Sequence, residues 1–188
     1  MTSQAFVPQL LHTSTRVSGF VAEALSLVTG VLLISLLAQV AIPLPWTPVP
    51  ITGQTLGVGL VALSWGARRG SLIMLVYLLL GSLGAPIFAM GKSGFLLGPT
   101  MGYLIGMGLA SFAMGALADR GYTRGFWTSL LAAYAGSVCT LGLGVLVLSF
   151  YLPSEQLLMA GLLPFLPGDL IKNTLAALTS WRLRRSLR

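Results

Sequence analysis

The chain has 188 residues, of which 55% are hydrophobic and only 8% are charged. Soluble domains average about a quarter charged residues, so this composition excludes an ordinary soluble domain and predicts an integral membrane protein. The net charge of +7 comes from short basic clusters between apolar segments. Such clusters are typical of juxtamembrane ends that face anionic membrane lipid, and the absence of a basic stripe with interleaved aromatic residues argues against nucleic-acid binding.

The apolar segments predict an all-α membrane protein with six transmembrane helices in a single transmembrane domain, residues 1–188. The expected spans are about 17–42, 52–67, 71–83, 99–118, 126–151 and 156–181. A helix needs about 20 apolar residues to cross the bilayer core, and the third span is short by this measure. Four prolines within residues 43–50 predict an extended loop after the first span, because proline cannot continue a helix. Arg68, Arg69 and Gly70 predict the turn between the second and third spans.

Nine of the eleven basic residues fall on one side of this six-span arrangement. They are Arg16, Arg68, Arg69, Arg120, Arg124, Arg182, Arg184, Arg185 and Arg188. Because cytoplasmic loops carry an excess of Lys and Arg, both chain ends are expected in the cytoplasm. The long proline-rich loop and the glycine-rich segment 84–98 then face outward.

Glycines recur at every fourth position along the fourth span, at Gly98, Gly102 and Gly106. This spacing of small residues lets another helix approach closely. We expect the partner helix to lie within the same bundle, and homodimerisation is the alternative.

Two lysines do not follow the charge pattern, Lys92 in the 84–98 segment and Lys172 inside the sixth span. Lys172 follows Asp169 by three residues, so both share one helical face, and Asn173 is adjacent. The prolines at positions 164 and 167 open the backbone just before them, and a broken helix at membrane depth is tolerated where it lines a protein cavity. A ligand site for a small polar solute is therefore predicted. The alternative is a helix cap and ion pair between Asp169 and Lys172 with no ligand.

The chain contains one His, one Cys and four acidic residues. No Ser-His-Asp set, metal cluster or nucleotide-binding motif can be assembled from these, so no enzyme activity and no cofactor is expected. Uphill transport would draw its energy from an ion gradient or from another subunit. Two rival hypotheses are a small membrane enzyme using Asp169 and Lys172 as an acid–base pair, and an autonomous channel or proton-coupled carrier in which Asp169 titrates.

Several strings resemble the BioY family, the biotin-binding S components of energy-coupling factor (ECF) transporters. They occupy residues 43–45 (PLP), 48–55 (PVPITGQT), 77–81 (YLLLG), 86–89 (PIFA), 98–106 (GPTMGYLIG) and 164–172 (PFLPGDLIK). The resemblance implies a six-helix S-component fold in a prokaryotic cell membrane and an outward-facing pocket for biotin, the transported substrate. It also implies two kinds of partner: a transmembrane coupling subunit of the EcfT type and two cytoplasmic ABC ATPases.

The resemblance also implies roles for the polar residues of the sixth span. Asp169 is expected to accept hydrogen bonds from the ureido N–H groups of biotin. Lys172 is expected to donate to the ureido carbonyl or to the carboxylate, beside the amide of Asn173. Lys92 is the second candidate for the carboxylate. Charge-assisted hydrogen bonds in a dry pocket contribute about 1.5–3 kcal/mol each.

Three aromatic residues, Trp46, Phe88 and Tyr103, are expected to cover the thioether ring, although residues of this type also serve as packing or interfacial anchors. Gln54 either contacts the ligand or closes the loop that follows the first span. The sequence favours neither role for Gln54.

Overall fold

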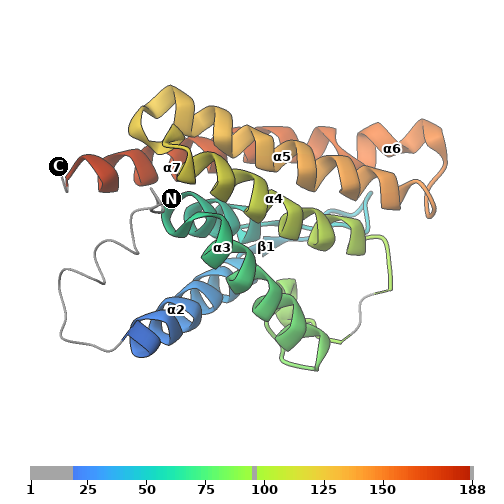
Figure 1. The fold of residues 1–188 in the computed structure, drawn as a ribbon. Helices are drawn as coiled ribbons and strands as arrows, with labels where there is room; N and C mark the ends of the chain where they lie inside the picture. The colour runs from blue at the N-terminus through green and yellow to red at the C-terminus, as the bar shows by residue number, and fades with distance from the viewer. Residues whose placement is uncertain (1–18, 95–96, 187–188) are drawn as a thin grey trace.

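The computed structural model describes residues 19–94 and 97–186, which form a bundle of α-helices (Figure 1). The helices are α2 (Gly19–Gln39), α3 (Gln54–Ser82), α4 (Met101–Asp119), α5 (Phe126–Leu148), α6 (Ser154–Gly161) and α7 (Leu166–Arg185). Short 3-10 turns occur at Ala89–Gly91, Tyr122–Arg124 and Leu163–Phe165. Within the described residues, four helices are long and apolar enough to cross a membrane, namely α2, α3, α4 and α5.

The proline-rich segment after α2 is extended, as predicted. It is flanked by two-residue strands, β1 (Ala41–Ile42) and β2 (Ile51–Thr52), which pair antiparallel with Ala41 opposite Thr52. The first helix therefore ends at Gln39, earlier than the predicted 42, because β1 takes the last residues of that segment. Residues 17 and 18, where the first span was expected to begin, lie outside the described residues.

The predicted turn at Arg68–Gly70 is wrong. These residues are helical, and α3 instead bends at Gly66, which has φ 80° and ψ −179°. This backbone conformation is essentially restricted to glycine. The Asp119 carboxylate at the end of α4 accepts a hydrogen bond from the Ala67 N–H at 2.9 Å. The bend therefore divides α3 into two arms, residues 54–65 and 67–82, and α4 supplies a partner for the exposed backbone of the second arm.

The glycines of α4 allow α5 to pack closely. A Cβ on Gly106 would lie 2.8 Å from the Cys139 carbonyl oxygen, and a Cβ on Gly102 would overlap Val147. The prediction of packing within the bundle is confirmed for these two positions, whereas Gly98 has no neighbour within 4 Å of such a Cβ. Helices α4 and α5 therefore pack closely against each other.

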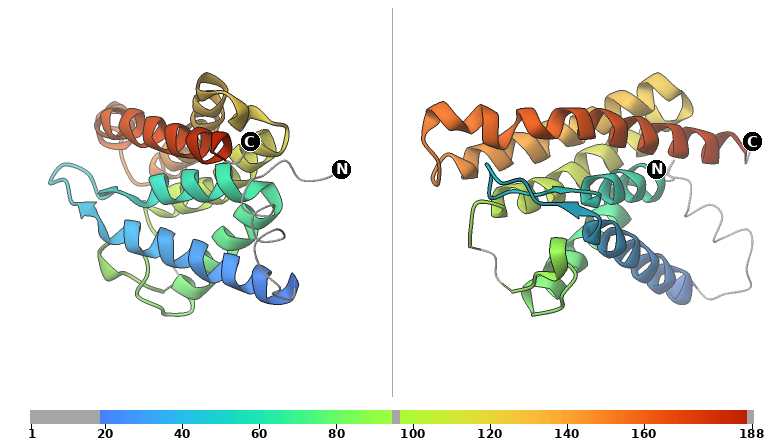
Figure 2. Two further views of the ribbon diagram at one scale, coloured as in Figure 1. Left: turned by 90° about the vertical axis from the view of Figure 1, so that its left-hand side faces the viewer. Right: turned by 180° about the vertical axis from the view of Figure 1, so that it is seen from behind.

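The predicted sixth span is divided. Helix α6 ends at Gly161, a 3-10 turn follows at Leu163–Phe165, and α7 begins at Leu166. Figures 1 and 2 show α7 alongside α5, with α6, the β1–β2 loop and the 84–94 connection at the end opposite the C-terminus. The break thus lies at the pole of the bundle where the two long connections gather.

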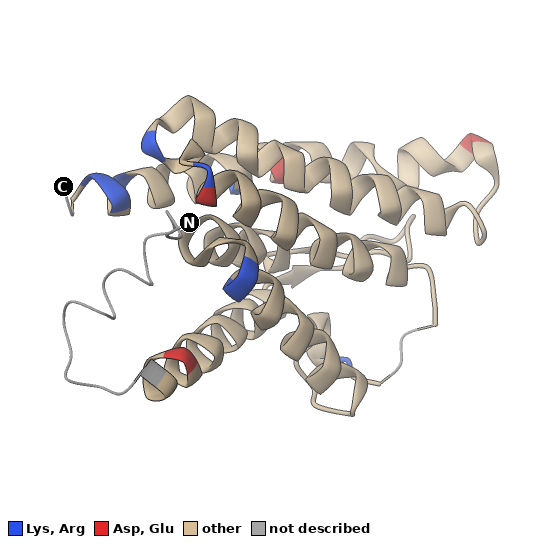
Figure 3. Cartoon of the chain, viewed as in Figure 1, with Lys and Arg blue, Asp and Glu red and all other residues tan. Residues whose placement is uncertain are grey.

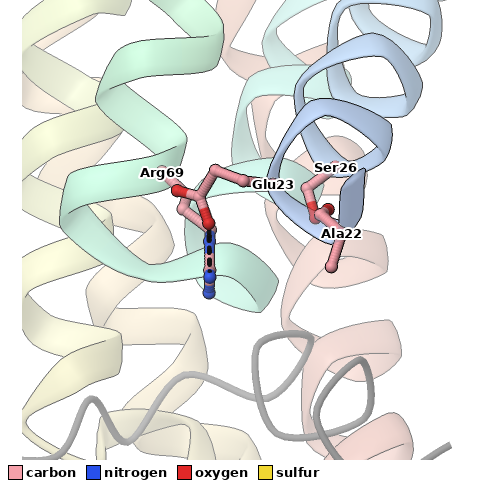
Figure 4. A network of polar contacts seen from close by, with 4 residues as sticks. All are labelled: Ala22, Glu23, Ser26 and Arg69. Atoms are coloured by element: carbon pink, nitrogen blue, oxygen red, sulfur yellow. Dashed lines mark hydrogen bonds and ion pairs between the residues drawn. The ribbon is translucent and has the colours of Figure 1, made fainter. Parts of the chain in front are cut away.

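Basic residues gather at the other pole. In Figure 3, the C-terminal end of α7 and the α4–α5 connection both carry Lys or Arg at the same end of the molecule. Arg16 and Arg188 lie outside the described residues. Near this pole Arg69 pairs with Glu23 at 2.6 Å, which joins α3 to α2 (Figure 4). Ser26 beside this pair is buried, with its hydroxyl donating to the Ala22 carbonyl at 2.9 Å.

Candidate substrate-binding site

One pocket extends into the bundle from the pole that carries the β1–β2 loop. It is lined by the first turns of α3 and α7, by α4, by the middle of α5, by the β1–β2 loop and by the 84–94 connection. Its volume is about 990 Å³, including the part that opens to solvent. Seven of the eight predicted binding residues line it: Gln54, Phe88, Lys92, Tyr103, Asp169, Lys172 and Asn173. The break before α7 positions the last three of these.

Asp169 is the centre of a polar cluster in the pocket wall. Its Oδ1 accepts a hydrogen bond from the Ser137 hydroxyl at 2.9 Å, and its Oδ2 accepts one from Asn173 Nδ2 at 2.9 Å. The same Asn173 nitrogen donates to Ser137 Oγ at 2.7 Å. The Asp169 and Asn173 side chains are both buried. Each carboxylate oxygen has two lone pairs, so both can still accept a hydrogen bond from a ligand.

Lys172 does not pair with Asp169. Its ammonium group donates to the backbone carbonyl of Thr52 in β2 at 3.1 Å, and no ion pair joins the two side chains within 4.0 Å. Helix α7 begins at Leu166, and no side chain caps it at Phe165. Neither the side-chain cap nor the direct ion pair of that alternative is therefore present. Both charged groups face the pocket while held by different elements, Asp169 by α5 and Lys172 by β2.

Aromatic side chains form the apolar wall. Phe88 and Tyr103 are buried, and the Tyr103 hydroxyl donates to the Gly161 carbonyl at 2.7 Å. Phe165 lies 5.8 Å from the Tyr103 ring, measured between centroids. A side chain on Gly144 would overlap the Tyr103 ring, so this glycine makes room for it.

The remaining predicted residues take three different positions. Gln54 is buried and donates from Nε2 to the Tyr77 hydroxyl at 2.8 Å, while also lining the pocket. Lys92 lines the pocket with an exposed side chain. Trp46 lies outside the pocket lining, and 62% of its surface is exposed.

Sequence reasoning missed Ser137, Thr52 and Tyr77. Ser137 is a polar residue within the apolar segment of α5, and Thr140, three residues later, lines the same pocket. That spacing was the available signal for a polar face on this helix. Thr52 contributes a backbone carbonyl, for which a side-chain pattern carries no signal. Tyr77 does not line the pocket and acts behind it.

The arrangement provides an acceptor cluster, a nearby ammonium group, an apolar middle and a second lysine on the lining. These features fit a small solute that has polar N–H groups, an apolar body and a negative charge. Among the described residues, no group of three His, Cys, Asp or Glu side chains could hold a metal ion.

The fold and pocket define a membrane protein of the S-component class. The structure matches the crystal structure of the S-component for biotin from an ECF-type ABC transporter, with a TM-score of 0.82 and 26% identity, covering 92% of this chain and 95% of that one. The BioY family model matches residues 9–188, and the chain belongs to the BioY family.

Curated relatives agree with this assignment. The biotin transporter BioY of Thermotoga maritima is 40% identical over 147 residues, which cover 77% of this chain and 86% of the relative. The biotin transporter BioY of Rhizobium etli is 34% identical over 148 residues, covering 73% and 79%.

Proposed function

We propose that this protein is the membrane subunit that captures biotin for uptake. The observation that carries the proposal is the cluster of buried Asp169 and Asn173 with half-buried Ser137, which faces the pocket beside an ammonium group that makes no direct ion pair with Asp169. Membership of the BioY family and the printed names of the relatives support biotin as the solute.

The site fits biotin end to end. The ureido N–H groups donate to Asp169, and Lys172 donates to the ureido carbonyl. The bicyclic body lies against Phe88 and Tyr103, and the valerate chain directs its carboxylate to Lys92. Gln54 has two roles in this proposal: it lines the pocket, and it donates a hydrogen bond to the Tyr77 hydroxyl behind the pocket. Trp46 joins the apolar wall only after the β1–β2 loop moves, because its side chain is exposed and outside the lining.

The membrane arrangement is part of the proposal. Helix α2, the two arms of α3, α4, α5 and the α6–α7 segment cross the cell membrane of a prokaryote as six spans. The gathering of basic residues at the C-terminal pole supports a cytoplasmic position for both chain ends. The pocket then opens outward, and the chain carries no catalytic site of its own.

The energy for uptake comes from partners in this proposal. The protein associates with a transmembrane coupling subunit of the EcfT type and two cytoplasmic ABC ATPases, which drive its reorientation. The match to an S-component of an ECF-type ABC transporter supports such a complex. Uptake should therefore stop in cells that lack the ATPases. Uptake by the chain alone, in ATP-free vesicles with a proton gradient, would contradict this part.

Titration calorimetry on the purified protein tests the binding proposal. Biotin should bind saturably without ATP, and dethiobiotin, which keeps the ureido ring, should compete. An analogue with a neutral tail should have a higher Kd, because it cannot form the charge-assisted contact of the carboxylate with Lys92. Absence of saturable biotin binding by folded protein would overturn the proposal.

A further inference from the structure

The 84–94 connection supplies three residues to the pocket, Phe88, Ala89 and Lys92, but has almost no regular structure. Its one 3-10 turn, Ala89–Gly91, contains two successive residues with left-handed backbone, Met90 at φ 62° and Gly91 at φ 66°. A left-handed conformation is unfavourable for a non-glycine residue. Contacts from elsewhere in the fold must therefore hold this segment in position.

The first such contact comes from α3. The Tyr77 hydroxyl donates to the Ile87 carbonyl at 3.0 Å and accepts from Gln54 Nε2 at 2.8 Å. Tyr77 has no exposed surface, and its ring meets the edge of Phe88 at 5.4 Å between centroids. A side chain on Gly81 would overlap the Phe88 ring, so the ring is confined on that side as well.

The second contact comes from the last residue of α2. Gln39 Nε2 donates to the Ile87 carbonyl at 3.3 Å and to the Phe88 carbonyl at 3.1 Å. Its Oε1 accepts from the Gly91 N–H at 2.9 Å. The Ile87 carbonyl is thus held from two helices, and both functional ends of the Gln39 amide bind the turn.

We infer that Tyr77 and Gln39 are positioning residues, which hold the Ile87 carbonyl from α3 and α2 and so fix Phe88 and Lys92 against the pocket. This inference rests on the proposed function for its effect on biotin. Neither side chain lines the pocket, so both act through the connection. We call the hydrogen bonds of Tyr77 and of Gln39 to the connection the two clamps. Loss of either clamp increases the motion of Phe88 and Lys92 and shortens the lifetime of the bound ligand.

Biotin dissociation tests the inference in two variants. Tyr77→Phe removes only the buried hydroxyl, and Gln39→Met removes the polar amide at similar length from an exposed position. Each variant loses more than one hydrogen bond, but these bonds act on the ligand only through the connection. Each should therefore speed dissociation about three- to tenfold, which is equivalent to one neutral hydrogen bond. Tyr151→Phe and Gln156→Met are matched controls, because both residues are exposed and outside the pocket lining. Control-like rates in both clamp variants would overturn the inference.

Hydrogen exchange without ligand separates this inference from the proposed function. The amides of Phe88, Gly91 and Lys92 donate within the connection to the Lys92, Phe88 and Ala89 carbonyls respectively, and the Gly91 amide also donates to Gln39 Oε1. They should exchange about three- to tenfold faster in both variants, while amides in α5 keep their wild-type rates. Failure of wild-type protein to bind biotin, with this exchange pattern present, would refute the function and retain the clamp. Unchanged exchange in both variants would refute the clamp even if wild-type protein binds biotin. Gln39→Met, an exposed change, preserves the test if Tyr77→Phe does not fold.

Discussion

Replacing Asp169 by Asn removes one charge and leaves the shape of the side chain nearly unchanged. The folded protein should tolerate the change, because the Asp169 carboxylate accepts only from Ser137 and Asn173. A hydroxyl can donate or accept, so Ser137 can reverse its hydrogen bond toward the new amide. The main loss therefore falls on the ligand, whose N–H groups would meet one neutral acceptor and one amide NH₂.

The size of that loss follows from the bonds that disappear. A hydrogen bond to a charged acceptor contributes about 1.5–3 kcal/mol. Loss of one such bond should raise the Kd for biotin about 10- to 150-fold. Dethiobiotin has the same ureido ring, so its Kd should rise by the same factor.

Calorimetric titration of the Asp169→Asn protein measures both ratios, with Glu155→Gln as the matched control. Glu155 is exposed in the first turn of α6 and does not line the pocket. The control should bind like the wild type. Equal and small effects in the two variants would show that the Asp169 charge has only a structural role, and would refute the assignment of the ureido contact.

Three further changes test the site and the bend. Ser137→Ala removes the donor to Asp169 Oδ1 and should weaken biotin binding about three- to tenfold, less than Asp169→Asn; a larger loss by calorimetry would make Ser137 a direct contact. Lys172→Met removes the donor to the Thr52 carbonyl and a ligand contact, and biotin should dissociate at least tenfold faster; an unchanged rate would exclude a ligand role. Gly66→Ala should lower the free energy of unfolding by about 1–3 kcal/mol because of its positive φ. Gly142→Ala is the control, because Gly142 is helical and has open space around it. Equal melting temperatures of the two variants in detergent would show that alanine at position 66 is not strained.

Helix positions could be predicted where apolar segments and prolines set them. The ends of α4 and α5 follow the apolar pattern closely, and the prolines before β2 define an extended segment, because these are local effects. The bend in α3 could not be located in this way. Gly66 and Gly70 lie on either side of Arg68 and Arg69, and the contact of Ala67 with Asp119, 52 residues away in the sequence, is non-local.

The pocket-lining residues were easiest to predict where burying a polar group in an apolar span costs the most free energy. Asp169, Lys172 and Asn173 stood out because charged and amide groups are rare within a span. Ser137 did not stand out, because a hydroxyl is common in membrane helices and costs little there. The role of Tyr77 depends on a carbonyl in another segment, which leaves no pattern in the sequence.

The spacing of Asp169 and Lys172 was compatible with both an ion pair and a ligand site, and in the structure the two side chains bond in different directions. Asp169 bonds toward α5 and Lys172 toward β2, so each charged group is held by a different element. Removing charged groups from water is costly, and a ligand that bonds to both would offset part of that cost. Such a ligand would contact two side chains of α7, of which Asp169 bonds to α5 and Lys172 bonds to β2. Binding and movement of the loop would then be linked by the same two hydrogen-bonding groups.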